Sequence, residues 1–161
     1  MSGAWRLVRH PDALAVLQRR AAALAALRAQ LAADDFLEAD VPVLSPAATQ
    51  DAHLSSPRVD VDGFAAPLFL QTSPELALKR LVCAGAPKVY ALGPAFRGGR
   101  EELSRHHQPA FAMLEWYRPG WEAAALMDEV AALMREALGA PGLAAEHIPY
   151  RALFLRHLGI D

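Results

Sequence analysis

A short stretch of this chain combines arginine, histidine, an aromatic ring and a carboxylate. Arg97 opens a segment rich in Arg, Glu and His, and the chain then returns through Phe111 and Glu115. A planar guanidinium suits a phosphate group, and an aromatic face suits a purine ring. A carboxylate suits an amine. These residue types predict part of an ATP-binding site within residues 95–117.

Residues 110–117 are predicted to form a strand, in which alternate side chains share one face. Phe111, Glu115 and Tyr117 fall on the same face of that strand. A carboxylate there is costly to bury without a partner, and the charged amine of a substrate would supply one. We therefore predict that Glu115 and Tyr117 surround a substrate ammonium group. Phe111 is either a stacking residue or an ordinary core residue.

A second carboxylate belongs to the stretch Thr72-Ser73-Pro74-Glu75, which has the pattern of a helix start. Glu75 is explained either by the helix dipole or by binding to an amine. Two acids, Glu75 and Glu115, suit a dicationic substrate such as lysine or β-lysine. An uncharged amino acid would leave one of them without a partner.

The elements that position these residues follow from the periodicity of the apolar residues. Helices are predicted over residues 10–34, 72–85, 121–138 and in a tail from residue 149. In the third helix, four apolar side chains are expected to face inward: Leu126, Val130, Leu133 and Met134. Short alternating or apolar runs predict strands over residues 36–41, 58–61, 67–71, 89–92 and 110–117, with a hairpin turn at Asp62-Gly63. This order predicts one α+β domain with an antiparallel sheet flanked by helices.

The composition excludes several classes of protein. Hydrophobic residues make up 53%, charged residues make up 21%, and the net charge is -2, so no strongly basic surface for nucleic acid is expected. No apolar run has membrane-spanning length, which predicts a cytoplasmic protein without a membrane partner. Cys83 is the single cysteine, and its apolar neighbours predict a buried thiol. His106 and His107 lack a third ligand nearby, so no metal site is predicted.

Three stretches resemble, in the right order, the motifs of the class II aminoacyl-tRNA synthetase fold in its lysyl branch. Residues 36–46, which contain Pro42, resemble motif 1. Residues 70–85 resemble the substrate segment with its TSPE sequence, and residues 95–117 resemble motif 2. Within this branch, the chain is similar to the ligases that attach (R)-β-lysine to elongation factor P. The resemblance covers about two thirds of the chain.

The resemblance implies a role for each residue of the motif 2 stretch. Arg97 would grip the α-phosphate of ATP and later that of the acyl-adenylate, as the catalytic residue. The adenine amine would be bound by Glu101 or Glu102. The remaining ATP-binding residues would be His107 and Gln108 near the phosphates and Phe111 against the adenine.

The resemblance also implies where the amino acid and a second subunit bind. The amino acid would contact Ser73, Glu75, Glu115 and Tyr117, and Pro42 would lie at the interface of a homodimer. The chain departs from the family by two extra residues in the motif 2 loop and by Ala110, where the family has Glu. The two extra residues leave both Glu101 and Glu102 as candidates for the family's glutamate, and Ala110 lacks the hydrogen-bond acceptor of that Glu.

The reaction implied is activation of (R)-β-lysine by ATP and Mg2+ to an adenylate, followed by transfer to a lysine of elongation factor P. No stretch resembles motif 3, so residues 1–161 are expected to be a partial catalytic domain, with the Mg2+ ligands outside this chain. No anticodon-binding domain precedes motif 1, which argues against tRNA as the acceptor. The alternatives are a fragment of a lysyl-tRNA synthetase and a non-catalytic truncated paralogue that binds amino acid or nucleotide.

Overall fold

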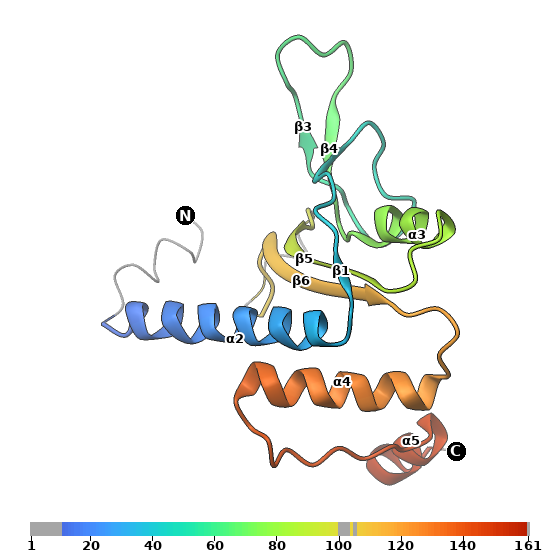
Figure 1. The fold of residues 1–161 in the computed structure, drawn as a ribbon. Coiled ribbons are helices and arrows are strands. Elements are labelled where there is room, and N and C mark those ends of the chain that lie inside the picture. Colours follow the sequence, from blue (N-terminus) through green and yellow to red (C-terminus); the bar gives the residue numbers. More distant parts are fainter. Residues whose placement is uncertain (1–10, 100–103, 105, 161) are drawn as a thin grey trace. The chain divides into compact units, whose positions relative to one another are not determined.

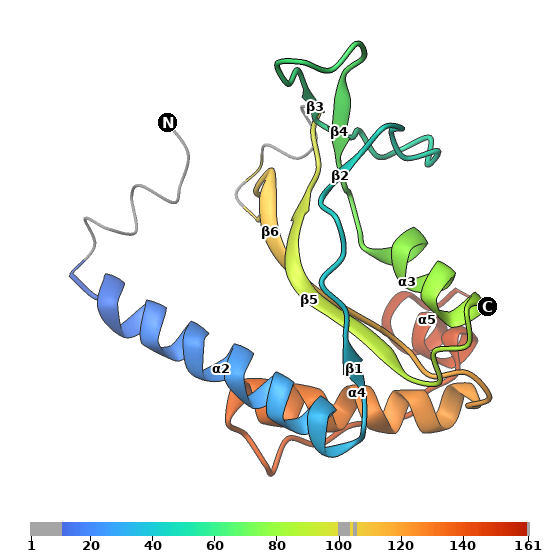
Figure 2. The same cartoon turned by 45° about the horizontal axis from the view of Figure 1, so that its top comes forward.

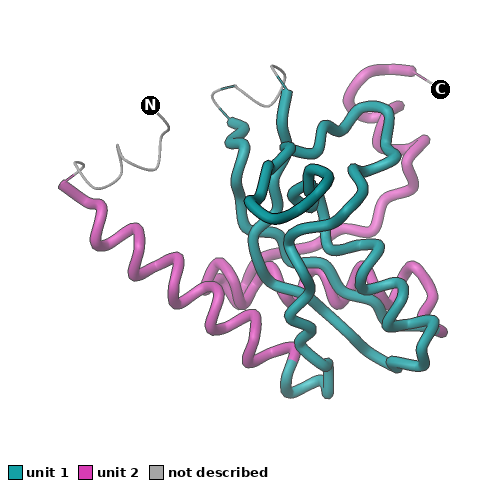
Figure 3. Tube along the Cα trace, turned by 90° about the horizontal axis from the view of Figure 1, so that it is seen from above, with its two compact units in different colours: residues 1–7, 32–119 teal, residues 8–31, 120–161 magenta. Residues whose placement is uncertain are grey.

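The structure is a computed structural model that describes residues 11–99, 104 and 106–160. The chain divides into two compact units, shown in Figure 3, and each is considered separately. Among the described residues, unit 1 contains residues 32–119, and unit 2 contains residues 11–31 and 120–160. The helices are α2 (Ala13–Ala33), α3 (Glu75–Cys83), α4 (Ala123–Leu138) and α5 (Tyr150–Leu158). The strands are β1 (Leu37–Glu38), β2 (Leu44–Ser45), β3 (Arg58–Val59), β4 (Leu68–Leu70), β5 (Val89–Phe96) and β6 (Ala110–Tyr117).

The main sheet of unit 1 has the strand order β1-β5-β6 (Figure 1). β5 and β6 pair antiparallel over their whole length, from Val89 opposite Tyr117 to Phe96 opposite Ala110. The expected α+β fold with an antiparallel sheet is therefore confirmed. β1 is the exception, because it pairs parallel with β5. A parallel pair needs a long connection, and here that connection contains β2, β3, β4 and α3.

β5 is longer than the sequence predicted, because it continues through Gly93 and Pro94 to Phe96. Proline lacks an N–H, so within a strand it is tolerated at a position whose N–H would point away from the neighbouring strand of the ladder. The N–H of Phe96, two residues on, donates to Gln71 at 2.9 Å, on the side of β5 away from β6. By alternation, Pro94 therefore removes no hydrogen bond from the β5–β6 ladder.

A second, smaller sheet in unit 1 has the order β2-β4-β3, and all its pairs are antiparallel (Figure 2). The predicted hairpin joins β3 to β4, and Gly63 in its turn adopts a positive φ of 87°. β2 was not predicted as a strand. It has only two residues, between Pro42 and Pro46, and its existence depends on pairing with Phe69 and Leu70.

Helix α3 packs on one face of β5 and β6 and closes the core of unit 1. Leu78 is fully buried with Val89 and Ala91, and Tyr117 borders the same cluster. The helix stops before Gly85, whose φ of 102° favours glycine. At its start, the Glu75 N–H donates to the Ser73 hydroxyl at 2.9 Å. Pro74 is the N-cap residue of this helix.

Cys83 is exposed on α3, so the prediction of a buried thiol was wrong. Its apolar neighbours in the sequence misled the prediction, because Leu78 and Val82 lie on the face of α3 that meets the sheet, whereas Cys83 does not.

Unit 2 contains α2 up to Leu31, α4 and α5. Of the four α4 side chains expected to face inward, Leu133 is buried, but the other three are 37–50% exposed: Leu126, Val130 and Met134. An apolar stripe shows which face of a helix prefers burial, but it does not show that anything covers that face. In the segment that follows α4, Arg156 forms a bidentate ion pair with Glu146 at 2.8 and 2.7 Å, and His147 Nε2 lies 3.3 Å from Asp128 Oδ1.

None of the described helices is long and apolar enough to cross a lipid bilayer.

Replacing Leu78 with alanine should destabilise unit 1, because it leaves a cavity where the side chain is 0% exposed. We expect a loss of about 2–5 kcal/mol in the free energy of unfolding, measured by urea denaturation. Leu76→Ala is the matched control, since Leu76 lies on the same helix but is 64% exposed, and it should change stability by less than about 0.5 kcal/mol. Equal losses for both variants would contradict the packing of α3 described above.

Candidate functional site

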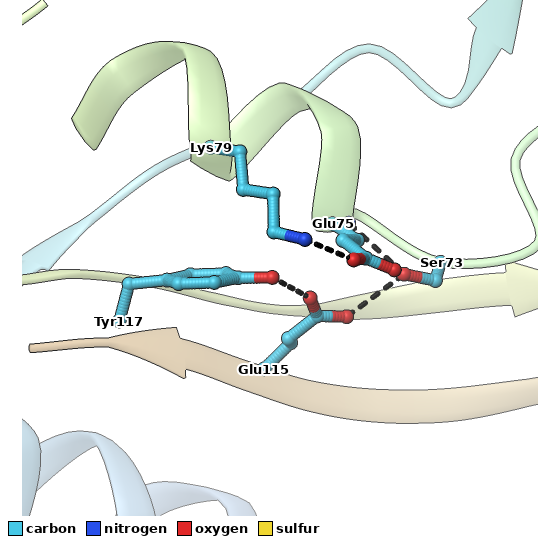
Figure 4. Close-up of polar contacts among 5 residues, drawn as sticks. All are labelled: Ser73, Glu75, Lys79, Glu115 and Tyr117. Atoms are coloured by element: carbon cyan, nitrogen blue, oxygen red, sulfur yellow. Dashed lines mark hydrogen bonds and ion pairs between the residues drawn. The ribbon is translucent and has the colours of Figure 1, made fainter. Parts of the chain in front are cut away.

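Five side chains form a polar cluster between the start of α3 and strand β6 (Figure 4). We refer to it as the acidic cluster: Ser73, Glu75, Lys79, Glu115 and Tyr117. The Ser73 hydroxyl donates to Glu115 Oε2 at 2.8 Å, and the Tyr117 hydroxyl donates to Glu115 Oε1 at 2.7 Å. Both oxygens of the Glu115 carboxylate are therefore held by hydroxyl groups. This fixes the carboxylate on the sheet face that α3 covers.

The hydroxyl donors satisfy the hydrogen-bonding needs of Glu115 without neutralising its charge. A hydrogen bond to a charged group contributes about 1.5–3 kcal/mol, which offsets part of the cost of removing a half-buried carboxylate from water. The two hydroxyls thus position the carboxylate without adding a positive charge to it.

Tyr117 is held in its neutral, donating form. Burial raises the pKa of its phenol, and the hydrogen bond to Glu115 and the negative charges of Glu115 and Glu75 raise it further. The hydroxyl therefore remains a donor to Glu115 throughout the physiological pH range.

Glu75 forms an ion pair with Lys79, one helical turn further along α3. This pair raises the pKa of Lys79, first through its hydrogen bond to Glu75 and then through the charge of Glu75, with a smaller contribution from Glu115. Sequence reasoning assigned Glu75 to the site but missed Lys79. The signal was present, because Glu and Lys four residues apart on a helix are expected to pair.

Arg97 and Phe111 form a second group at the far end of β5 and β6. The Arg97 guanidinium lies over the Phe111 ring, 5.3 Å from its centroid, a geometry that stabilises by about 0.5–2 kcal/mol. Its Nε donates to the Thr72 carbonyl at 3.4 Å. Thr72 is buried and directly precedes Ser73, so the segment before α3 contacts both groups.

Between these two groups lies a strip of small residues. The register places Ala91 opposite Glu115 and Ala95 opposite Phe111, with Gly93 between them on the same face of β5. A Cβ added to Gly93 would meet no atom within 4 Å. There is therefore open space directly beside Gly93, whereas Ala91 and Ala95 are buried and Met113 lies opposite Gly93 on the same sheet face.

The other predicted residues lie elsewhere or outside the described residues. His107 and Gln108 are exposed, and His107 Nδ1 is 2.7 Å from the Ser104 hydroxyl. Within the described part of the chain, no hydrogen bond or ring contact joins either residue to the two groups. Pro42 is exposed between β1 and β2, and Glu101 and Glu102 lie outside the described residues. Among the residues described, no three His, Cys, Asp or Glu side chains gather in a way that would hold a metal ion.

Comparison with known proteins shows to which family this chain belongs. The family model of class II tRNA synthetases (D, K and N) matches residues 3–147. An elongation factor P (R)-β-lysine ligase of Yersinia enterocolitica is 41% identical over 152 residues, which cover 92% of this chain and 46% of that protein. The same ligase of Yersinia pestis strain Pestoides F gives the same identity and coverage. The chain thus spans about half the length of these curated relatives.

A solved structure shows the same fold. Asparaginyl-tRNA synthetase from Pyrococcus horikoshii, complexed with asparaginyl-adenylate, superposes with a TM-score of 0.72 at 23% identity, over 87% of this chain and 32% of that one. The resemblance inferred from the sequence motifs is therefore confirmed: this chain belongs to the class II tRNA synthetases of the D, K and N type, and within them it is similar to the elongation factor P (R)-β-lysine ligases.

Proposed function

We propose that this protein activates (R)-β-lysine, or lysine, with ATP to form an adenylate and transfers the acyl group to a lysine side chain of elongation factor P. The observation that carries the proposal is the placement of two carboxylates, Glu75 and Glu115, beside Ser73 at one end of a face of the β5–β6 sheet, with Phe111 and Arg97 toward its other end. The names of the curated relatives supply the amino acid and the acceptor.

The acidic cluster is proposed to bind the two ammonium groups of the amino acid. An ammonium about 4 Å from a carboxylate gains about 4 kcal/mol at an effective dielectric constant of about 20. Glu115, held by Ser73 and Tyr117, would bind one ammonium without having to reorient. Glu75 at the start of α3 would bind the other.

Arg97 and Phe111 are proposed to bind the α-phosphate and the adenine of ATP. When the amino-acid carboxylate attacks that phosphate, negative charge builds on the phosphate oxygens, and a fixed guanidinium stabilises it. Arg97 would exchange its long 3.4 Å bond to Thr72 for a shorter, charge-assisted one. The junction between amino acid and phosphate would then lie over Gly93.

The remaining assignments belong to the same proposal. Glu101 or Glu102 would accept from the adenine amine, and His107 and Gln108 would approach the phosphates. Residues 1–161 would form part of a catalytic domain of a cytoplasmic homodimer, with Pro42 at the interface. ATP-dependent members of this family imply Mg2+, but the described residues offer no cluster that would hold it, so no metal ligand is assigned to this chain.

The proposal is tested by amino-acid-dependent ATP–pyrophosphate exchange with (R)-β-lysine beside lysine. Arg97→Ala should lower the exchange rate by about 100-fold or more, because it removes the charge that stabilises the transition state. Arg80→Ala, at an exposed position of α3, removes the same charge away from the site and should leave the rate unchanged. Equal rates for the wild type and Arg97→Ala would sink the assignment of Arg97. Ligand binding without any exchange would favour the non-catalytic alternative, and charging of tRNA would favour the lysyl-tRNA synthetase.

Glu115→Gln should weaken binding of (R)-β-lysine by about 10- to 100-fold, since the side chain keeps its shape but loses its charge. Isothermal titration calorimetry in the presence of a non-hydrolysable ATP analogue measures the change. Glu122→Gln, an exposed acid before α4, is the matched control and should bind like the wild type. Unchanged affinity in Glu115→Gln would remove Glu115 from the amine site.

Gly93→Val should block the ligand without harming the fold. A Cβ at this position meets open space, so the melting temperature should be unchanged, whereas the added methyl groups would occupy the place proposed for the acyl-phosphate junction. We expect at least about 10-fold weaker binding of a non-hydrolysable β-lysyl-adenylate analogue, by analogy with the cost of overpacking.

The control for this variant is Ala112→Val. Ala112 pairs with Pro94, the residue after Gly93, and this change adds similar bulk at an exposed position on the opposite face of the sheet. If Gly93→Val binds the analogue as tightly as Ala112→Val does, the ligand does not cross this strip.

A further inference from the structure

Lys79 brings an ammonium group of the protein's own into the acidic cluster. Its Nζ donates to Glu75 Oε1, an oxygen of the carboxylate proposed to bind a substrate ammonium. Figure 4 shows the amine directed away from the helix toward Glu75 and above the Tyr117 hydroxyl. Without substrate, Glu75 is therefore already paired with a cation.

The ion pair between Glu75 and Lys79 is exposed to solvent and can therefore separate easily. Glu75 and Lys79 are four residues apart on α3, and their side chains are 49% and 53% exposed. An exposed pair of this kind is a weak interaction, because water screens both charges. The lysine side chain is long and can turn to solvent when another cation arrives.

Glu115 also influences Lys79, although the two side chains are not paired with each other. The hydroxyls of Ser73 and Tyr117 each donate to one oxygen of Glu115, whereas Lys79 donates to Glu75, and the negative charge of Glu115 also acts on the Lys79 ammonium. With Glu75, Glu115 and Lys79 charged, the cluster carries a net charge of minus one rather than minus two. Lys79 thus reduces the repulsion between the two carboxylates when no ligand is bound.

We infer that Lys79 is an internal competitor for Glu75: the substrate's ammonium binds by displacing the Lys79 ammonium from this carboxylate. The inference rests on the proposed function, because it assumes that Glu75 binds an ammonium of the amino acid. Lys79 acts through Glu75 and is a positioning residue that sets the affinity for the amino acid. It forms no bond to the reacting carboxylate or phosphate.

The inference predicts that removing the lysine tightens binding. Lys79→Met should lower the dissociation constant of (R)-β-lysine, and of lysine, by about two- to fivefold, the range set by the strength of exposed ion pairs. In pyrophosphate exchange it should lower KM and leave kcat unchanged, because only the ground-state competition is lost. Lys79→Arg, which keeps a cation four residues from Glu75, should restore values close to those of the wild type.

Arg80→Met is the matched control. It removes one positive charge from the neighbouring position of the same helix, also exposed, and so tests whether any loss of positive charge near the site tightens binding. A similar change in Arg80→Met and Lys79→Met would overturn the inference in favour of a general electrostatic effect. Unchanged or weaker binding in Lys79→Met would also overturn the inference, because it would show that Lys79 does not compete with the amino acid for Glu75 in the wild type.

A spectroscopic signal reports the displacement directly. In protein labelled with 15N at lysine side chains, the Nζ resonance assigned by its loss in Lys79→Arg should shift to the position of a solvated lysine when (R)-β-lysine is added. A resonance that stays in place while the ligand binds would show that Lys79 remains paired with Glu75. The inference would then fail, but the proposed function would not. Failure of the wild-type protein to bind (R)-β-lysine at all would instead remove the proposed function together with the inference.

Discussion

The pairing of β5 with β6 is the constraint on which the candidate site depends. Eight consecutive residue pairs fix the register, from Val89 opposite Tyr117 to Phe96 opposite Ala110. A slip of one residue would move every side chain of β6 to the opposite face, and Glu115 would then lose its bond to Ser73. The register also sets Ala91 opposite Glu115 and Ala95 opposite Phe111, so the same ladder fixes the spacing of the two candidate groups along β6.

Glu115 shows how this fold keeps a charge on a partly covered face. An isolated buried charge is costly, and a buried salt bridge within the protein would neutralise it. Here two neutral hydroxyls supply the hydrogen bonds, and burial together with Glu115 itself keeps the Tyr117 phenol protonated. The carboxylate is therefore stabilised enough to be held in one place, but it still attracts an external cation. Glu75, with Lys79 as its partner, follows the opposite strategy.

The parts of the structure that could be predicted from the sequence are those governed by local rules. The bounds of β6 and the face shared by Phe111, Glu115 and Tyr117 follow from alternation, and the start of α3 follows from its capping pattern. β2 and the parallel pairing of β1 could not be predicted, because each depends on a partner distant in the chain. The exposure of Leu126, Val130 and Met134 on α4 and of Cys83 on α3 likewise depends on what covers each helix face, which periodicity does not encode. Whether the predicted residues bind ATP and amino acid is still a prediction; the structure brings Glu115 together with Ser73 and Tyr117, and Arg97 together with Phe111.

The segment from Thr72 to Glu75 links the two ends of the site. The carbonyl of Thr72 accepts from Arg97, the hydroxyl of Ser73 donates to Glu115, and the same hydroxyl accepts from the first turn of α3. Thr72 is buried and Leu78 anchors the helix against the sheet, so this segment has little freedom to move alone. A change at Arg97 on binding phosphate would free the Thr72 carbonyl, and a change at Glu115 on binding an amine would act on the adjacent residue. The two ligand ends are therefore connected through one short, well-packed piece of backbone, which gives a physical route by which nucleotide and amino acid would influence each other's binding.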